Sequence, residues 1–197
     1  MKELRIMSPN FTPRPNGLAD IWGVIIHWTA TSKTVSAENV ANYFKNPASK
    51  VSAHVVIDRD GTVVRCVDRK NAAWHAGTAR YDFNRDHEIS EEERHVNTHT
   101  LGYELCHLGP TEKYWPEKMI QSLAACIRRD NVVCPNLKLR NITDHQAVSL
   151  SGKIDVNKDF PADLLFWYIL HPAQEPHPSI YSRLPEWAQR QVKEIGR

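Results

Sequence analysis

The chain of 197 residues lacks the features that mark membrane-spanning, nucleic-acid-binding and disulfide-stabilised proteins. It has no apolar run of about eighteen residues, so the sequence predicts no transmembrane helix. Its formal net charge is +2, with no evident cluster of lysine and arginine. This argues against nucleic acid or an anionic membrane as the main partner. Its four cysteines include no C-x-x-C pair, and we expect free thiols rather than a disulfide framework.

The first residues, 1–6, also lack the apolar segment of a secretory signal peptide. We therefore expect synthesis in the cytoplasm, with any export by another route. What the chain does have is a hydrophobic content of 41%, which is enough for one sizeable core at this length. A single domain, present as a monomer, is the simplest expectation.

The apolar pattern predicts an α/β fold with a central mixed β-sheet flanked by helices. Short apolar runs predict strands over residues 23–28, 51–57, 62–67 and 101–108. Helical spacing covers residues 37–44, 115–130 and 162–170. We expect the main domain to span residues 23–170, after an irregular arm over 1–22 and before a tail over 171–197 whose helix packs on the domain.

Three separated stretches carry residues that could form one metal site. His27 ends an apolar run, Glu104 lies inside another, and His145 is followed within eleven residues by Lys153 and Asp155. A hydrolytic zinc ion needs three protein ligands and one open position for water. His27, His145 and Asp155 could supply the ligands, leaving Glu104 and Lys153 to handle protons and negative charge. Taken singly, each has an ordinary alternative, because strand histidines are often core residues and Glu104 could face solvent.

The combination resembles the zinc-dependent N-acetylmuramoyl-L-alanine amidases of the type 2 amidase family. That family includes phage T7-type lysozymes, cytosolic anhydromuramyl amidases and peptidoglycan-recognition proteins. The likeness runs from about Gly23 to Phe160. Residues 52–62, which begin Ser-Ala-His-Val, resemble the family's second strand and hairpin. Residues 74–77, Trp-His-Ala-Gly, resemble its substrate-side loop.

The resemblance implies a zinc site in a surface groove with His27, His145 and Asp155 as ligands. Some phage members have cysteine as the third ligand; here Asp155 takes that position, and a carboxylate is also an acceptable zinc ligand. The resemblance assigns proton transfer to Glu104 and stabilisation of an oxyanion to Lys153. The implied reaction is hydrolysis of the amide between N-acetylmuramic acid and L-alanine of the stem peptide.

The resemblance also places three residues beside the substrate: Trp74 as an apolar wall, His75 as a contact, and His54. For His54 an alternative stays open, since a strand histidine could simply hydrogen-bond a buried backbone group. Phage members carry a catalytic tyrosine immediately before this histidine, where the present chain has Ala53. We therefore expect the branch of the family in which the carboxylate, not a tyrosine, transfers the proton.

An acidic insert over residues 82–97 follows the Trp-His-Ala-Gly segment. Aligned with a calcium-binding EF-hand loop, it offers oxygen donors at Asp82, Asn84, Asp86, Glu88 and Glu93. His87 departs from the pattern, because the sharp turn normally needs glycine there, and no strong helix precedes the loop. If Ca²⁺ binds, we expect a structural role; the alternative is a solvated acidic insertion.

Two cellular contexts stay open for such an amidase. The first is a phage-type endolysin that acts on the cell wall after release by another protein. The second is a cytosolic enzyme that recycles anhydromuramyl peptides. A different class, a non-catalytic peptidoglycan-binding protein, would be expected to have lost a zinc ligand, and here all three positions are filled. Substrate size separates the first two, because an endolysin should clear intact sacculi and a recycling enzyme should prefer soluble muropeptides.

Overall fold

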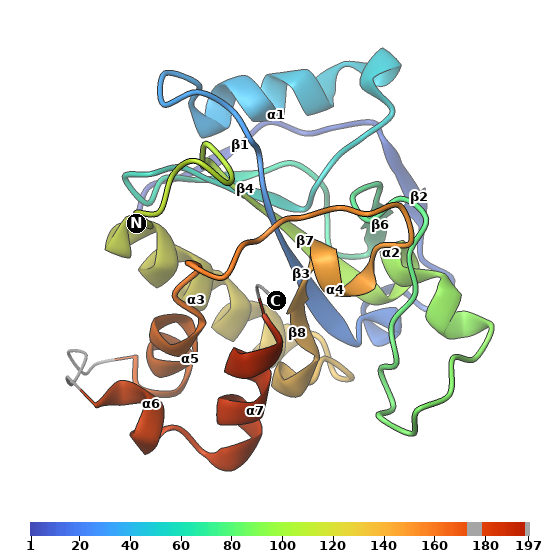
Figure 1. Ribbon diagram of the computed structural model, residues 1–197. Coiled ribbons are helices and arrows are strands. Elements are labelled where there is room, and N and C mark those ends of the chain that lie inside the picture. The colour runs from blue at the N-terminus through green and yellow to red at the C-terminus, as the bar shows by residue number, and fades with distance from the viewer. Residues whose placement is uncertain (173–178, 196–197) are drawn as a thin grey trace.

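The computed structural model describes residues 1–172 and 179–195 (Figure 1). Within these residues, six strands form a sheet in the order β1-β5-β4-β7-β3-β8. They are β1 (Glu3–Arg5), β3 (Gly23–Trp28), β4 (Val55–Ile57), β5 (Val63–Arg65), β7 (Thr100–Leu105) and β8 (Ile142–Asp144). β4 and β5 pair antiparallel as the predicted hairpin, and the other neighbours pair parallel. The predicted α/β fold with a mixed sheet is confirmed.

Helices flank the sheet, as expected. They are α1 (Ala37–Lys45), α2 (Val96–His99), α3 (Glu117–Val133), α4 (His145–Val148), α5 (Ala162–Leu170), α6 (Ile180–Arg183) and α7 (Glu186–Glu194). Short 3-10 turns are η1 (Gly17–Asp20), η2 (Pro47–Ser49), η3 (Glu92–Arg94) and η4 (Leu139–Asn141). Helix α1 begins at a capping box between Ser36 and Asn39, which satisfies the first free N–H groups of the helix.

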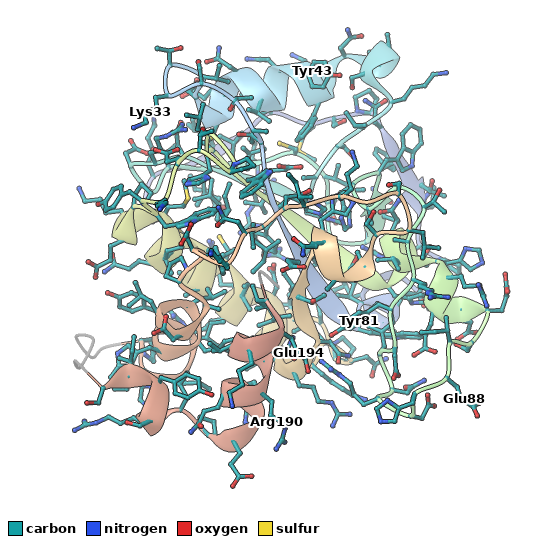
Figure 2. All side chains as sticks on the ribbon, in the orientation of Figure 1. Lys33, Tyr43, Tyr81, Glu88, Arg190 and Glu194 are labelled. Atoms are coloured by element: carbon teal, nitrogen blue, oxygen red, sulfur yellow. The ribbon has the colours of Figure 1, made fainter. Side chains whose placement is uncertain are left out.

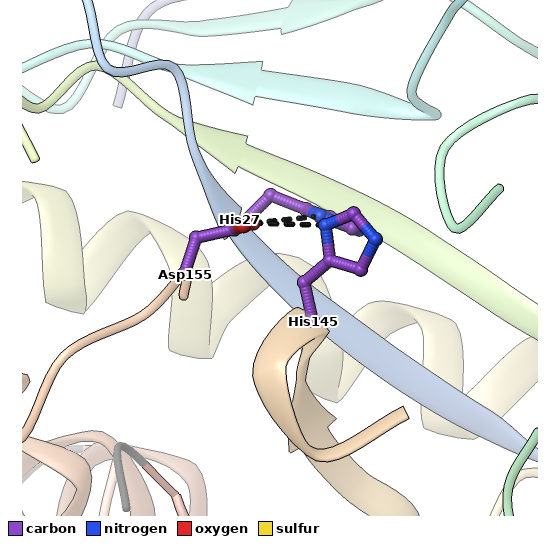
Figure 3. A group of neighbouring side chains, drawn as sticks. All are labelled: His27, His145 and Asp155. Carbon is purple, nitrogen blue, oxygen red and sulfur yellow. Dashed lines mark hydrogen bonds and ion pairs between the residues drawn. The ribbon is translucent and has the colours of Figure 1, made fainter. Parts of the chain in front are cut away.

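The two faces of the sheet serve different purposes. Neighbouring residues of a strand point to opposite faces. Tyr103 of β7 faces α3, where its hydroxyl donates to the Asp130 carboxylate, and Figure 3 shows α3 passing behind β3. Glu104, the next residue of β7, therefore faces the other side of the sheet. That second face is the one that carries the candidate site.

The prediction of an irregular arm over residues 1–22 is wrong in part, because this segment contains two strands. Strand β1 pairs with β5 in the main sheet. Strand β2 (Phe11–Pro13) pairs antiparallel with β6 (Asn71–Ala73) in a separate two-stranded sheet. The buried Arg14 then donates to the carbonyls of Arg69, Asn97 and Thr100. Strands of three residues are too short to show an alternating pattern in a sequence.

The tail packs on the domain where the structure describes it. The ring of Trp187 on α7 meets Phe166 of α5 edge to face, with centroids 5.8 Å apart. Leu184, Ala188 and Ile195 are buried beside this contact. Residues 173–178 and 196–197 of the expected tail lie outside the described residues. Among the described residues, no helix is long and apolar enough to cross a membrane.

Candidate metal centre

Two parallel strands bring the histidines of the predicted site together. β3 pairs with β8 so that Ile26 lies opposite Asp144, and the next residues are His27 on β3 and His145 at the start of α4. The carboxyl ends of parallel strands meet at one edge of a sheet, so both imidazoles reach the same edge. Asp144 accepts the N–H of Ala147 at 2.7 Å and thereby caps the short helix that begins at His145.

Asp155 completes the group from the loop that follows α4 (Figure 3). Its Oδ2 lies 3.1 Å from Nδ1 of His27 and 3.1 Å from Nδ1 of His145. One donor atom from each of the three side chains lies within 4.8 Å of the others, and all three residues are buried. In the described part of the chain, no other group of three histidine, cysteine or acidic side chains comes this close.

The charges of these groups suit a cation. Burial disfavours the charged form of Asp155, but hydrogen bonds to His145 and His27 outweigh that cost and lower its pKa below the ordinary value. Burial lowers the pKa of His27, despite its hydrogen bond to Asp155. At neutral pH the group therefore offers an ionised carboxylate and a neutral imidazole, the protonation states that metal ligation requires.

Glu104 lies beside the three candidate ligands. It is the register partner of His27 in the pairing of β3 with β7, and parallel partners project from the same face of the sheet. Its Oε2 is buried without a hydrogen-bond partner among the described residues. Burial first, and the charge of Asp155 second, raise the pKa of Glu104 to about 8, while Lys153 opposes the rise. Perturbed carboxyl groups of this kind are typical of functional sites.

Lys153 lies on the exposed loop between α4 and Asp155. Its backbone N–H donates to Ser149 Oγ at 3.3 Å, next to Gly152, which has a positive φ of 74°. The charge of Lys153 lowers the pKa of both His27 and Glu104. The ammonium group is therefore close enough to influence both groups, and its role in charge stabilisation stays a prediction.

His54 is part of the core rather than of the site surface. It is 2% exposed. Its Nδ1 accepts the Gly102 N–H at 2.9 Å, and its Nε2 lies 3.0 Å from the Asn71 carbonyl oxygen. Burial, and next the charge of Arg14, hold its pKa well below the ordinary value. These contacts fit the alternative of a histidine that binds buried backbone, and substrate contact by His54 stays a prediction.

His75 contacts the metal group, and Trp74 precedes it in the chain. Trp74 is partly exposed, and its indole N–H donates to Thr12 Oγ1 at 2.9 Å. His75 packs against His27, with Nδ1 2.9 Å from His27 Nε2, and its own Nε2 lies 3.3 Å from Thr100 Oγ1. Substrate contact by Trp74 stays a prediction. For His75, both ring nitrogens already have partners within the protein.

Sequence reasoning missed a cavity of about 260 Å³ beside Glu104. Its remaining lining comes from the end of β3, the loop after it and α1: Trp28, Thr29, Thr31, Val35, Asn39, Val40, Tyr43 and Phe44. Tyr43, which Figure 2 labels on α1, is 58% exposed. The sequence signal for this cavity was Tyr43, an aromatic residue beside Phe44 in the predicted helix. Such a pair of aromatic residues is equally typical of a helix that packs into a core.

The acidic insert is held by its own carboxylates. Asp82 accepts the N–H groups of Arg85, Asp86 and His87 at 2.5 to 3.2 Å. Glu93 is buried and accepts four hydrogen bonds, from Phe83 N, Asn84 N, and the N and Oγ of Ser90. His87 adopts a positive φ of 69°, the conformation for which glycine was expected. Three of the predicted calcium donors, Asp82, Asp86 and Glu93, therefore already accept hydrogen bonds from backbone N–H groups. Calcium binding stays a prediction.

Arg85 fastens the insert to the C-terminal helix. Its guanidinium pairs with Glu194 at 3.1 Å and donates to Gln191 Oε1 at 2.7 Å, both on α7. The same group donates to Tyr81 Oη at 2.8 Å and to the Arg140 carbonyl at 2.7 Å. Figure 2 shows Tyr81 and Glu194 near each other at this junction. The insert and the tail, far apart in sequence, thus form one joined region.

A mixed sheet that presents two imidazoles and a carboxylate at one edge, with a separate buried carboxyl beside them, has the donor set of a metal-dependent hydrolase. The sequence profile of the N-acetylmuramoyl-L-alanine amidase family matches residues 17–158, and the chain belongs to that family. All three candidate ligands and Glu104 fall within the matched segment.

Comparison with individual proteins agrees with the family. The chain is 25% identical over 170 residues to the 1,6-anhydro-N-acetylmuramyl-L-alanine amidase AmpD of Haemophilus influenzae, which covers 79% of this chain and 86% of that protein. The crystal structure of a selenomethionine AmpD derivative has a TM-score of 0.61 at 23% identity, covering 83% of this chain and 92% of the other. A mutant endolysin from Bacillus subtilis has a TM-score of 0.54 at 20% identity, covering 78% and 88%. The structural likenesses show a shared fold.

Proposed function

We propose that the protein hydrolyses the amide between the lactyl carbonyl of N-acetylmuramic acid and the amino group of L-alanine, with Zn²⁺ held by His27, His145 and Asp155. The observation that supports it most is the convergence of these three buried donors on one point beside an unpaired buried carboxyl. Two neutral imidazoles and one carboxylate are an established ligand set for catalytic zinc. Bound there, zinc supplies Lewis-acid activation of water and of the amide carbonyl.

Glu104 is the group that we propose for proton transfer. It takes a proton as water adds to the carbonyl carbon, and it delivers that proton to the amine nitrogen as the C–N bond breaks. A strand-borne carboxyl suits this role because β7 fixes its position. Its raised pKa of about 8 in the metal-free protein suits the acid half of this cycle. To accept the proton it must be ionised, the form that a bound cation nearby favours.

Lys153 is the group that we propose for charge stabilisation. Negative charge grows on the carbonyl oxygen during the attack, and an ammonium group nearby favours that state over the neutral substrate. The cavity beside Glu104 offers room for the part of the substrate that flanks the amide, with apolar walls from Trp28 and Phe44 and polar groups from Thr31 and Asn39. Trp74 is proposed as a further substrate contact.

The acidic insert is proposed to bind Ca²⁺ through oxygen atoms of Asp82, Asn84, Asp86, Glu88 and Glu93, with a structural role. The support is the spacing of these donors and the crowding of acidic groups. The internal hydrogen bonds of Asp82 and Glu93 weigh against it, because a cation would have to share those oxygens.

Two substrates are candidates, and they define the cellular role. Alignment over most of a 1,6-anhydro-N-acetylmuramyl-L-alanine amidase favours soluble anhydromuropeptides and a recycling role in the cytoplasm. The endolysin role, with intact peptidoglycan as substrate, rests on the common fold. The three retained ligands argue against a purely binding function.

The test is mass spectrometry of the products released from purified sacculi and from soluble anhydromuropeptides, each with and without a chelator. Release of free stem peptides beginning with L-alanine, lost on chelation and in Glu104→Gln, supports the amidase proposal. Cleavage at any other bond contradicts it. The ratio of the two initial rates assigns the role: preference for sacculi supports an endolysin, and preference for muropeptides supports recycling.

A further inference from the structure

The orientation of the candidate ligands is set by one short segment, residues 75 and 76. His75 Nδ1 lies 2.9 Å from His27 Nε2, and the carbonyl oxygen of Ala76 lies 3.2 Å from His145 Nε2. In both imidazoles the Nε2 atom points to this segment, and the Nδ1 atom points to Asp155. One loop therefore contacts the far side of both histidines.

The directions of the hydrogen bonds follow from their end points. The Thr100 hydroxyl donates its single hydrogen to the Val96 carbonyl at 2.7 Å, so toward His75 Nε2 it can only accept. His75 therefore carries its proton on Nε2 and presents an unprotonated Nδ1. That atom accepts from His27, which must then be protonated on Nε2. In the metal-loaded site this leaves Nδ1 of His27 as the nitrogen for the ion, in place of the hydrogen bond that Nδ1 makes to Asp155 without metal.

For His145, a single contact fixes the protonated nitrogen. A carbonyl oxygen can only accept, so the contact with Ala76 places the proton of His145 on Nε2. In the metal-loaded site its Nδ1, which hydrogen-bonds to Asp155 without metal, is likewise the nitrogen left for the ion. Both histidines thus offer the same nitrogen to a metal ion beside the carboxylate.

The loop itself is fixed from two sides. Asn97 Oδ1 accepts the N–H groups of His75 at 3.2 Å and Ala76 at 2.8 Å. On β7, a Cβ atom at Gly102 would lie 2.4 Å from Cγ of the His75 ring, closer than any side chain allows. Glycine at this buried strand position leaves the space in which the ring sits. Two independent features of the fold therefore serve the placement of His75.

We propose that His75 is a positioning residue for the metal centre: with the Ala76 carbonyl, it fixes both ligating imidazoles as Nε2–H tautomers that present Nδ1 to the metal. This inference rests on the proposed zinc site and replaces the expectation that His75 binds substrate. Hydrogen-bond partners behind metal ligands fix tautomer and ring orientation, and their loss typically costs about 10- to 100-fold in metal affinity.

The test compares zinc dissociation constants, measured by chelator competition on the purified full chain. His75→Leu should bind zinc about 10- to 100-fold more weakly than wild type. His75→Asn places an oxygen acceptor where Nδ1 stood and should recover most of the affinity. His99→Asn is the matched control: His99 is also a buried imidazole, stacked on Trp22 with Nδ1 2.9 Å from the Asp20 carbonyl oxygen. It should bind zinc like wild type.

A second readout is long-range ¹H–¹⁵N NMR of the zinc-loaded protein, which should show His27, His75 and His145 protonated on Nε2. Gly102→Ala, which crowds the His75 ring, should weaken zinc binding in the same direction as His75→Leu. Unchanged zinc affinity in His75→Leu with a raised KM would overturn the inference in favour of a substrate contact. Wild-type protein that binds no zinc would instead overturn the proposed zinc site, and this inference with it.

Discussion

Glu104 lies directly opposite His27 in the parallel pairing of β7 with β3. This register places a carboxyl of raised pKa and a candidate metal ligand on one face of the sheet, held by two central strands rather than by loops. β3 is buried along its whole length, so the backbone position of His27 is set by the core of the sheet.

The three candidate ligands should be jointly required for metal. Replacing His27, His145 or Asp155 by alanine should remove both bound zinc and activity, because two donors hold zinc far more weakly than three. Elemental analysis of the purified variants after dialysis checks this. Full zinc occupancy in His145→Ala would sink the assignment.

Glu104→Gln and Lys153→Met should keep zinc but lose activity by on the order of 10² to 10⁴ in rate. Neither residue is assigned as a ligand, so the loss should lie in kcat. Lys158→Met, at an exposed position further along the same loop, is the matched control and should stay near the wild-type rate. Near-normal turnover in Glu104→Gln at saturating substrate would mean that another group moves the proton.

The stability of the metal-free protein should depend on pH through Glu104. Its pKa is raised from 4.5 to about 8 on folding, so it stabilises the fold fully below pH 4.5 and this stabilisation is lost as pH rises through 8. Glu104→Gln cannot ionise and should gain stability relative to wild type over that window. At about 1.4 kcal/mol per pKa unit, the gain is on the order of 3 to 5 kcal/mol. Urea unfolding with chelator at several pH values measures it; a difference that does not change with pH contradicts the argument.

Calcium should raise the melting temperature of the zinc-loaded protein if the insert binds it, because a ligand of the folded state stabilises by mass action. Asp86→Ala should abolish that shift and leave zinc in place. Asp86 is exposed and receives only the Glu88 N–H, so this variant should cost little stability by itself, unlike Glu93→Ala. Calorimetric titration that detects no binding at millimolar Ca²⁺ would remove calcium from the insert.

Arg85→Ala should lower the free energy of unfolding by about 1 to 3 kcal/mol, because several hydrogen bonds of a partly buried guanidinium are lost together. Its guanidinium joins Tyr81, Gln191, Glu194 and the Arg140 carbonyl. Arg190→Ala on the same helix breaks only an exposed pair with Glu186 and should change stability by less than about 0.5 kcal/mol. Equal changes in the free energy of unfolding for the two variants, measured with denaturant, would show that the contacts of Arg85 do not stabilise the fold more than an exposed ion pair does.

The sequence predicted the parts of the fold with long or strongly patterned signals. Apolar runs in the sequence predict β3, α3 and α5 without a structure. His145 and Asp155 could be predicted to lie close together because only one short loop separates them. Strands β1, β2 and β8 have only three residues each, too few to show a hydrophobic pattern. Their position in the fold depends on pairing with segments far away in the chain. The sequence alone could not decide between core and cleft for His54, because that depends on Gly102 and Asn71 reaching both ring nitrogens. The cavity beside Glu104 was hidden for a similar reason, since it forms only where α1 meets the end of β3.

Strand β1 also bears on the order in which the sheet can be assembled. Leu4 pairs with Val64, so this edge of the sheet cannot close until the hairpin of β4 and β5 has been synthesised and folded. Until then, the early segment of the nascent chain has no partner strand, and β5 has one unpaired side open to other chains. Because β5 precedes β7 (Thr100–Leu105) and β8 (Ile142–Asp144) in the chain, all residues of this edge are present before the centre and the opposite edge of the sheet can form.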